Sequence, residues 1–468
     1  MKLTDYYKYA LIMKNKKGII MKKDIIFNKK VGRLALYWSL FIGGAIIGSY
    51  TAQKKVEIKE PHLKQIIAAW NLTQHEYIVP VNEAMKNKMM NAAISGMVSS
   101  LDPHSEWYSQ EDAKKLNDLL KGQYGGIGIR FQLTEQGAVI REVKENSPAD
   151  KQNIKPGDII IEVNHVKIDE KALSLDIWQG QIGSEMNIKI KRKTESQPEV
   201  LTLKRENISG FEVLSEIKKL SNDKNWLRIQ IKDFQETTLE EVAFHIRNLW
   251  AFSKNANTPL EGIILDLRGS PGGLVPASAG LASLFLTENK DIVNVNIHGK
   301  PVDTLKTINL VKEPWSDWLK KAPLIVWDNK ATASAAEILL AALKENERIS
   351  FILGDQTFGK GTVQTIHEMQ NGGQIKISSA WYTTPKGHYI QGNGVLPDYQ
   401  ISYPEEVEKQ LAVYSENKLK GYLISPNSEN KPQNTIKEKI SIDKEDLRTE
   451  NSVLEWYWKQ TDSILNKK

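Results

Sequence analysis

Residues 262–274 read GIILDLRGSPGGL, and this stretch decides the fold class. The apolar run up to Leu267, broken only by Asp266, is typical of a strand in a sheet that is covered on both faces. Gly272 and Gly273 follow and open a predicted helix that ends near residue 285. A buried strand that turns directly into a helix predicts an α/β fold, in which helices pack on a layered sheet.

The same pattern returns further along the chain. Buried strands are predicted at 324–327 and 349–353, a helix is predicted between them at 332–344, and residues 374–382 are strand-like. We therefore assign 209–404 to one α/β unit.

The segments on either side of this unit have a different character. Residues 57–121 are predicted to be helical, because apolar side chains recur every three or four residues. Residues 122–208 alternate short strands with turns, which indicates an independent β-rich module. Residues 405–468 form a charged C-terminal tail that is rich in Lys, Glu and Asn, and they are expected to be helical or loosely ordered.

Residues 34–53 carry no charge and follow a basic stretch, 1–33. The length suits one bilayer span, and the basic flank predicts a cytoplasmic N-terminus. We therefore expect a single-pass protein of the cell inner membrane, with its catalytic part on the periplasmic side. A cleaved signal peptide remains an alternative, and Met21 is a second candidate start.

Composition excludes several classes of function. The net charge is only +6 and no basic stripe interleaves with aromatic residues, so nucleic-acid binding is not expected. The chain has no cysteine, which rules out disulfides and thiol nucleophiles. Its eight histidines lack metal-ligand spacing, so neither a metal nor another cofactor is expected.

Two loops of the α/β unit suit an oxyanion hole and a nucleophile. Gly272 and Gly273 can bring backbone N–H groups close to a negative charge at a helix N-terminus, although a plain tight turn would also explain them. Ser334 lies at the start of the next helix, where a nucleophile would be exposed. The alternative for Ser334 is a helix cap, because Ser334 and Glu337 have capping-box spacing.

A third loop, residues 354–364, reads GDQTFGKGTVQ. It nearly matches a phosphate-binding loop but has Gly361 where a hydroxyl should bind magnesium, and a β-branched run follows instead of a helix. Lys360 is therefore interpreted as a lysine on a tight loop. A serine nucleophile needs a base, and a lysine can serve when burial lowers its pKa. Gln364 could orient that lysine.

In this order, the segments LDLRGSPGGL, TASAAE and FGKGTVQ resemble the C-terminal processing (tail-specific) peptidases, whose motifs run RGNPGG, SASASE and FGKGxVQ. Further segments that resemble the family are LDPHS at 101–105, SAWYTTPKG at 379–387 and GVLPD at 394–398. Ser270 and Ala336 depart from the family pattern, and one extra residue falls near 345–348, but none of these positions is catalytic in the family.

The resemblance implies a role for each matching residue. Ser334 would be the nucleophile, Lys360 the general base and Gln364 the residue that orients the lysine. Backbone N–H groups of Ala335 and of Gly272 or Gly273 would form the oxyanion hole. It also implies an α/β (α+β) multidomain protein: a layered crotonase/ClpP-like peptidase core, an inserted PDZ domain and an N-terminal helical segment.

The module at 122–208 resembles the PDZ domain of the same family. Its carboxylate-binding loop would consist of Gly125, Gly126, Ile127, Gly128 and Ile129, which would bind the C-terminus of a peptide. The expected function is therefore a serine endopeptidase that cleaves proteins near their free C-termini. A PDZ-based scaffold with an inactive peptidase domain, and a crotonase-type hydrolase or isomerase, are the alternatives. Besides binding protein substrates and a membrane, such a protein could bind an adaptor protein or form a homo-oligomer.

Overall fold

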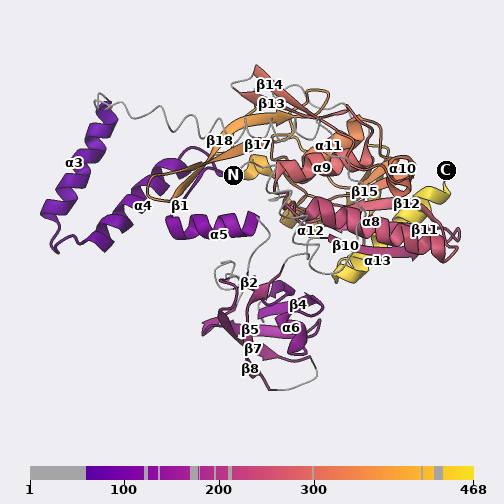
Figure 1. Ribbon diagram of the computed structural model, residues 1–468, viewed down its shortest axis with the longest axis horizontal. Coiled ribbons are helices and arrows are strands. Elements are labelled where there is room, and N and C mark those ends of the chain that lie inside the picture. The colour runs from indigo at the N-terminus through magenta and orange to yellow at the C-terminus, as the bar shows by residue number, and fades with distance from the viewer. Residues whose placement is uncertain are drawn as a thin grey trace. The chain divides into compact units, whose positions relative to one another are not determined.

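The computed structural model describes residues 60–467, apart from 121–124, 135–136, 169–177, 179, 194–196, 209–212, 298–299, 413–414 and 426–435 (Figure 1). The N-terminal elements are α3 (Pro61–Glu76), α4 (Glu83–Ser99), β1 (Glu106–Tyr108) and α5 (Gln110–Leu120). The β-rich module contains β2 (Gly125–Gly126), β3 (Ile129–Thr134), β4 (Gly137–Val143), α6 (Pro148–Lys151), β5 (Ile159–Val163), β6 (Val166–Lys167), β7 (Glu185–Lys191), β8 (Glu199–Lys204) and β9 (Glu206–Asn207).

The α/β unit and the C-terminal segment follow. Their elements are β10 (Val213–Lys219), β11 (Asn225–Ile231), α8 (Thr238–Asn255), β12 (Leu260–Asp266), α9 (Val275–Phe285), β13 (Asp291–Ile297), β14 (Lys300–Lys306), α10 (Pro314–Lys321), β15 (Leu324–Trp327), α11 (Ala335–Glu345), β16 (Phe351–Gly354), β17 (Thr362–Glu368), β18 (Gln374–Thr383), β19 (Tyr399–Ser402), α12 (Glu405–Leu411), η2 (Glu416–Lys418), β20 (Glu438–Ser441) and α13 (Glu450–Asn466).

By their contacts the described residues form two compact units. One contains α3, α4, most of β1, and residues 365–370 and 374–377 of β17 and β18. The other contains the remaining elements, including every residue proposed above for catalysis.

A seven-stranded sheet in the order β10-β11-β12-β15-β16-β19-β20 forms the centre of the α/β unit. β10 is antiparallel to β11, and every later pair in that order is parallel. A smaller sheet includes β14, β13, β18 and β17. This confirms the mixed, layered α/β architecture that was predicted from the strand–helix alternation.

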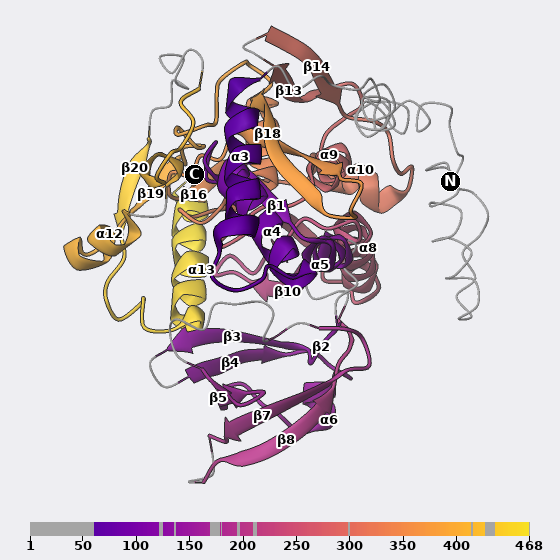
Figure 2. The same cartoon turned by 90° about the vertical axis from the view of Figure 1, so that its left-hand side faces the viewer.

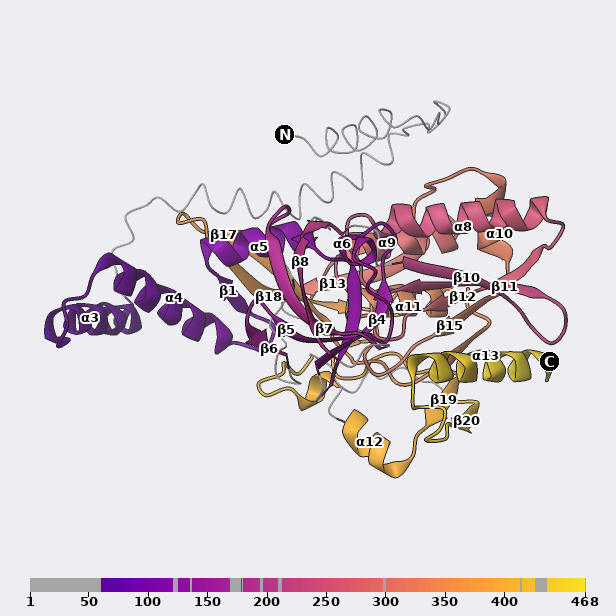
Figure 3. The same ribbon diagram turned by 90° about the horizontal axis from the view of Figure 1, so that it is seen from below.

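The large sheet is buried on both faces because its strands are apolar throughout. Ile263 and Leu265 of β12 face a core shared with α8, α9, α10 and α11, while Ile264 faces a second core that contains residues of α13. Figure 3 shows α8 and α13 on opposite sides of β11, β12 and β15. Burial on both faces explains why these strands lack polar alternation.

Residues 405–468, which the sequence presented as a charged tail, contribute to the second core. β20 adds to the sheet beside β19, with Ile401 opposite Ile440. The aromatic run 456–458 of α13 is buried, and two of its rings pack against Trp327 of β15. The Nε1 of Trp327 also donates to Thr461 at 3.0 Å.

The β-rich module has its own sheet, β3-β4-β5-β7-β8, with β6 paired to β5 (Figure 2). Its core is separate from those of the α/β unit and is built on alternate residues such as Met186, Ile188 and Ile190 of β7.

The predicted localisation, a single-pass protein of the inner membrane, is corrected by the structure. Among the helices of the described residues, none is long and apolar enough to cross a bilayer. The segment 34–53, from which the prediction came, lies outside the described residues.

Candidate active site

Three loops meet at one edge of the large sheet because β12, β15 and β16 are adjacent and parallel. The carboxyl ends of parallel strands lie at the same edge, so the loops at 267–274, 328–334 and 355–361 come together. Hydrogen bonds connect them directly. The N–H of Ala333 donates to the carbonyl of Ser270 at 2.9 Å, and the N–H of Phe358 donates to that of Thr332 at 3.0 Å.

Ser334 lies immediately before α11 with a backbone φ of 56° and ψ of −120°. A positive φ is strained for a residue with a side chain and costs on the order of 1–3 kcal/mol. The side chain is half-buried at the N-terminus of the helix, where the helix dipole favours a developing negative charge. Ser334 and Glu337 form the capping box that their spacing predicted, but the backbone of Ser334 differs from the extended backbone of an ordinary helix cap.

The carboxylate of Glu337 joins the serine turn to the lysine loop. Its Oε2 accepts from the backbone N–H groups of Ser334 at 2.8 Å and Lys360 at 2.9 Å. Its Oε1 accepts from the hydroxyl of Thr357 at 2.5 Å and the N–H of Gly359 at 2.7 Å. One side chain therefore fixes the backbone on both sides of the predicted catalytic pair.

Glu337 is completely buried, and burial raises its pKa to about 7. The hydrogen bonds from Thr357, Gly359, Ser334 and Lys360 act in the opposite direction and lower it. Removal from water thus raises the pKa by more than the four hydrogen bonds lower it, and the carboxyl can change protonation state near neutral pH.

The lysine loop is held from its other side as well. The Oε1 of Gln391 accepts from the N–H of Gly361 at 2.7 Å, and its Nε2 donates to the buried Glu416 at 2.9 Å. The backbone N–H of Glu416 donates to the carbonyl of Phe358 at 2.9 Å. Lys360 itself is half-buried, and it lies between Gly359 and Gly361.

Gln364 follows in β17. Its Nε2 donates to the hydroxyl of Thr362 at 2.9 Å and to that of Ser378 at 3.2 Å. With the amide nitrogen so engaged, its Oε1 is the atom that can accept from a lysine.

The two glycines of the first loop have different surroundings. A Cβ on Gly272 would lie 2.7 Å from the amide nitrogen of Ala335 and 2.8 Å from the Cβ of Ser334. A Cβ on Gly273 would instead lie 2.3 Å from the carbonyl oxygen of Phe234. Within the described residues, no hydrogen bond uses the N–H of Gly272 or of Ala335. Gly272 is thus the glycine next to the predicted nucleophile.

The residues of the predicted peptide-binding loop differ in their backbone partners. The N–H of Gly125 is already donated to the carbonyl of Gly180 at 3.1 Å, and Gly126 pairs with Glu206. Ile127 is a buried core residue, and Gly128 has a φ of +79°. Ile129 begins β3, which lies at the edge of its sheet and, in the described part of the module, pairs with β4 alone.

From the sequence, Glu337 was recognisable only as a possible cap, and neither Thr357 nor Gln391 was predicted to belong to the site. Tyr382 was not predicted either, and its N–H donates to the carbonyl of Gly361 in the lysine loop at 3.0 Å. Tyr382 lies in the SAWYTTPKG segment, which was the available signal. Within the described part of the chain, no group of three or more His, Cys, Asp or Glu side chains could hold a metal ion.

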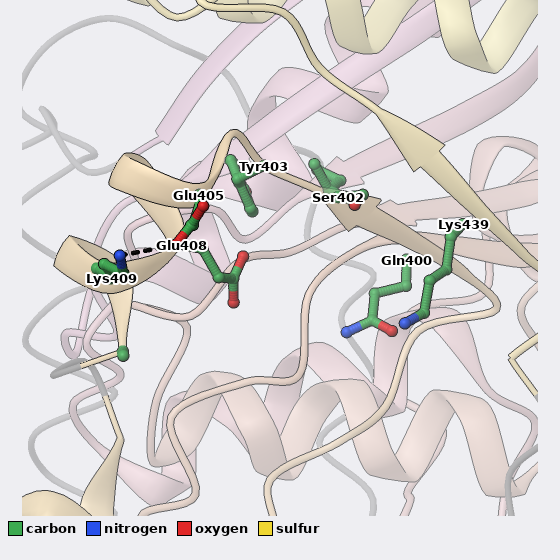
Figure 4. A pocket seen from close by; sticks show the side chains of 9 residues that line it. Gln400, Ser402, Tyr403, Glu405, Glu408, Lys409 and Lys439 are labelled. Carbon is green, nitrogen blue, oxygen red and sulfur yellow. Dashed lines mark ion pairs between the residues drawn. The ribbon is translucent and has the colours of Figure 1, made fainter.

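A separate hollow of about 420 Å³ lies between β19 and α12 (Figure 4). Gln400 and Lys439 lie on one side of it, and Glu405, Glu408 and Lys409 lie on the other. Its lining includes none of the residues proposed for catalysis. It is therefore not the candidate active site.

Comparison with known proteins gives two family matches. Residues 226–401 match the model of peptidase family S41, and residues 125–201 match that of the PDZ domain. The first match covers the three loops of the candidate active site, and the second covers the predicted peptide-binding loop.

Individual relatives cover more of the chain. A probable CtpA-like serine protease of Staphylococcus epidermidis is 31% identical over 86% of this chain and 78% of its own length. The carboxy-terminal processing protease CtpA of Bacillus subtilis is 32% identical over 78% of this chain and 74% of its own length. A solved structure, the photosystem II D1 C-terminal processing protease, aligns at a TM-score of 0.46 and 23% identity, covering 82% of this chain and 98% of that one.

Proposed function

The chain belongs to peptidase family S41 as a serine-type peptidase with a PDZ domain, and from this premise we propose that Ser334 and Lys360 are its catalytic pair. The main support is the Glu337 carboxylate, which accepts from the backbone N–H groups of both residues. It holds the strained serine turn and the lysine loop in one fixed geometry, as a reaction between the two side chains requires.

In the proposed mechanism, the neutral amine of Lys360 takes the hydroxyl proton of Ser334 while Oγ attacks the scissile carbonyl. The resulting oxyanion accepts from the N–H groups of Gly272 and Ala335, which are adjacent. Lys360 then returns the proton to the leaving amine, and the C–N bond breaks to leave an ester on Ser334. Water, deprotonated by the same lysine, hydrolyses that ester.

Two further residues would position the lysine. Glu337 fixes its backbone, and Gln364 would accept a hydrogen bond from its Nζ through Oε1. The contacts of Gln364 with Thr362 and Ser378 support this role because they use its amide nitrogen. A neutral lysine accepts the serine proton through its nitrogen lone pair. The lone pair points at the serine only if the N–H groups of the lysine point at other acceptors.

We further propose that the PDZ domain binds the free C-terminus of a protein substrate. The edge strand β3 offers an unpaired side to which an extended peptide can add as a further strand. The terminal carboxylate would be held by the N–H groups of Ile127 and Gly128, which no hydrogen bond uses within the described residues. The N–H of Gly125 is excluded by its bond to Gly180.

The catalytic assignment is tested by peptide cleavage with Ser334→Ala, Lys360→Ala and a control, Lys330→Ala. Lys330 belongs to the loop before Ser334 but forms an ion pair with Glu408 at 2.7 Å. Both catalytic variants should lose several orders of magnitude in kcat, and the control should keep wild-type activity. Turnover by Ser334→Ala within tenfold of the wild type would rule out the assignment.

The PDZ assignment is tested with one peptide that carries either a free or an amidated C-terminus. Amidation removes the charge, so binding should weaken by about ten- to a hundredfold. Equal binding and equal cleavage of the two peptides would show that the PDZ domain does not read the terminus.

A further inference from the structure

Residues 416–423 of the C-terminal segment contact the lysine loop, although they lie beyond residues 226–401, which match peptidase family S41. The backbone N–H of Glu416 donates to the carbonyl of Phe358 at 2.9 Å, and the N–H of Phe358 donates to that of Thr332 in the serine turn at 3.0 Å. Glu416 is 0% exposed. Charged side chains are rarely buried so deeply unless they are hydrogen-bonded, so the contacts of this carboxylate indicate what it does.

The side chain of Gln391 connects Glu416 to the loop that carries Lys360. Its Oε1 accepts from the N–H of Gly361 at 2.7 Å, and its Nε2 donates to Oε1 of Glu416 at 2.9 Å and to the carbonyl of Leu423 at 3.0 Å. The direction of the amide follows from these partners, because a backbone N–H can only donate, whereas a carbonyl and a carboxylate accept. The amide therefore has one orientation that satisfies all its partners, and Glu416 and Leu423 together select it.

The backbone next to this amide is also in close contact with the lysine loop. A Cβ on Gly361 would lie 2.4 Å from the backbone nitrogen of Gln391, and the N–H of Gly392 donates to the carbonyl of Gly359 at 2.8 Å. A Cβ on Gly392 would in turn lie 3.9 Å from Cε2 of Tyr422. Residues 391–392 thus contact both the lysine loop and the 416–423 segment, so a displacement here reaches the backbone on both sides of the proposed base.

We propose that Glu416 is a positioning residue for the reaction. Its carboxylate sets the direction of the Gln391 amide, and the amide holds the N–H of Gly361 so that the amine of Lys360 meets the hydroxyl of Ser334. This inference rests on the proposed roles of Ser334 and Lys360. Glu416 takes no part in the proton transfers and acts through the geometry of the loop, so its loss should lower kcat and leave KM unchanged.

The first test changes the side chains at positions 391 and 416 in the full chain. In Gln391→Glu, one carboxylate oxygen still accepts from Gly361, but the other faces the oxygens of Glu416 and Leu423, which are all acceptors. The loop should shift, and kcat for peptide cleavage should fall about a hundredfold with KM unchanged. Adding Glu416→Gln supplies an amide that donates to the new carboxylate, so the double variant should recover to within about tenfold of the wild type. Recovery stays incomplete because the carbonyl of Leu423 still lacks its donor.

Gln356→Glu is the matched control. Gln356 lies in the same loop, and its Nε2 also donates to a backbone carbonyl, that of Asn393, at 2.7 Å, but the residue is exposed and water can replace the bond. This variant should cleave at the wild-type rate.

Glu416→Gln alone covers the case in which Gln391→Glu does not fold, because it keeps the shape of the side chain and removes a buried charge. A neutral amide accepts from Gln391 more weakly than a carboxylate does. The kcat of this variant should therefore fall severalfold, again with KM unchanged.

Wild-type kcat in a folded Gln391→Glu or Glu416→Gln would overturn the proposal. A folded double variant no faster than Gln391→Glu would overturn it too, because the two side chains would then act separately. A purely structural role predicts that activity falls only in proportion to the unfolded fraction in urea titrations, and that result would also count against a positioning role.

Lys360→Ala, measured in the same assay, tests the proposed function on which the inference rests. If Lys360→Ala cleaves at near the wild-type rate, the catalytic pair is wrong whatever the other variants do. If Lys360→Ala is inactive while Gln391→Glu and Glu416→Gln cleave like the wild type, only the role of Glu416 is wrong.

Discussion

Glu337→Gln should remove most of the activity while changing the free energy of unfolding little at pH 8. The two carboxylate oxygens accept two hydrogen bonds each. A glutamine has one acceptor oxygen, and its amide nitrogen is best placed opposite Thr357, because a hydroxyl can turn to accept. The N–H of Gly359 bonds to the same position as Thr357, so it then faces the amide nitrogen and has no acceptor.

Two opposing energies decide the effect on stability. A buried N–H without an acceptor costs about 1–3 kcal/mol. On the other side, burial raises the pKa of Glu337 from 4.5 to about 7, so the ionised carboxylate destabilises the fold by about 3 kcal/mol at pH 8. Glutamine avoids this second cost, and the net change in unfolding free energy should stay within about 2 kcal/mol.

The effect of Glu337→Gln on activity is not offset by a second, opposing effect. If the Gly359–Lys360 backbone shifts by about 1 Å, the amine of Lys360 no longer meets the hydroxyl of Ser334, and kcat should fall about a hundredfold or more. Steady-state cleavage of a peptide gives kcat and KM, and urea unfolding gives the stability. Glu313→Gln is the matched control, because Glu313 caps α10 and accepts from Trp315 at 2.7 Å.

The pH dependence of stability provides an independent check. Because the folded pKa of Glu337 is above its unfolded value, its contribution to stability is complete below about pH 4.5 and is lost as pH rises through about 7. Relative to Glu337→Gln, the wild type should therefore gain about 3 kcal/mol between pH 8 and pH 4. Wild-type kcat in a folded Glu337→Gln would refute the reasoning, as would activity loss that merely parallels unfolding.

Three further predictions concern other parts of the site. Gly272→Ala should lower kcat about a hundredfold, because its Cβ would lie 2.7 Å from the amide nitrogen of Ala335. Gly269→Ala, whose Cβ would have no atom near it, should stay active, and equal activities of the two variants would contradict this. Lys360→Arg should be inactive at every pH tested, because a guanidinium stays charged, and activity that returns at high pH would contradict the role of a neutral amine. Burial raises the pKa of Asp355 to about 6, so between pH 4 and pH 7 the wild type should lose about 2 kcal/mol more stability than Asp355→Asn in urea titrations. An identical fall in both proteins would contradict this.

The strands that lead into the loops of the candidate active site could be predicted, because a short apolar run in the local sequence marks each of them. The apolar run at 324–327 is β15 with the same bounds, and the predicted strand at 349–353 overlaps β16. Parallel neighbours place their carboxyl ends at one edge, so the meeting of Ser334 with the lysine loop follows from topology. The positive φ of Ser334 has no such local signal, because a glycine, which would mark such a conformation, is absent from that position.

The contacts that fix the site could not be predicted, because they join residues far apart in the chain. Spacing suggested that Glu337 might cap Ser334, but nothing local indicated its bonds to Gly359 and Lys360. The fold of the C-terminal segment was hidden by its charged composition. The aromatic residues 456–458 and Ile464 are the buried apolar residues by which α13 packs on the sheet.

The most direct test of the catalytic pair is to locate the acyl group formed with an activated peptide ester, by acid quench and tandem mass spectrometry of the digested protein. The mechanism predicts one acyl group, on the hydroxyl of Ser334, formed faster as pH rises and absent from Ser334→Ala and Lys360→Ala. An acyl group on another residue, or one that forms on Ser334 at the wild-type rate in Lys360→Ala, would contradict the pairing of Ser334 with Lys360.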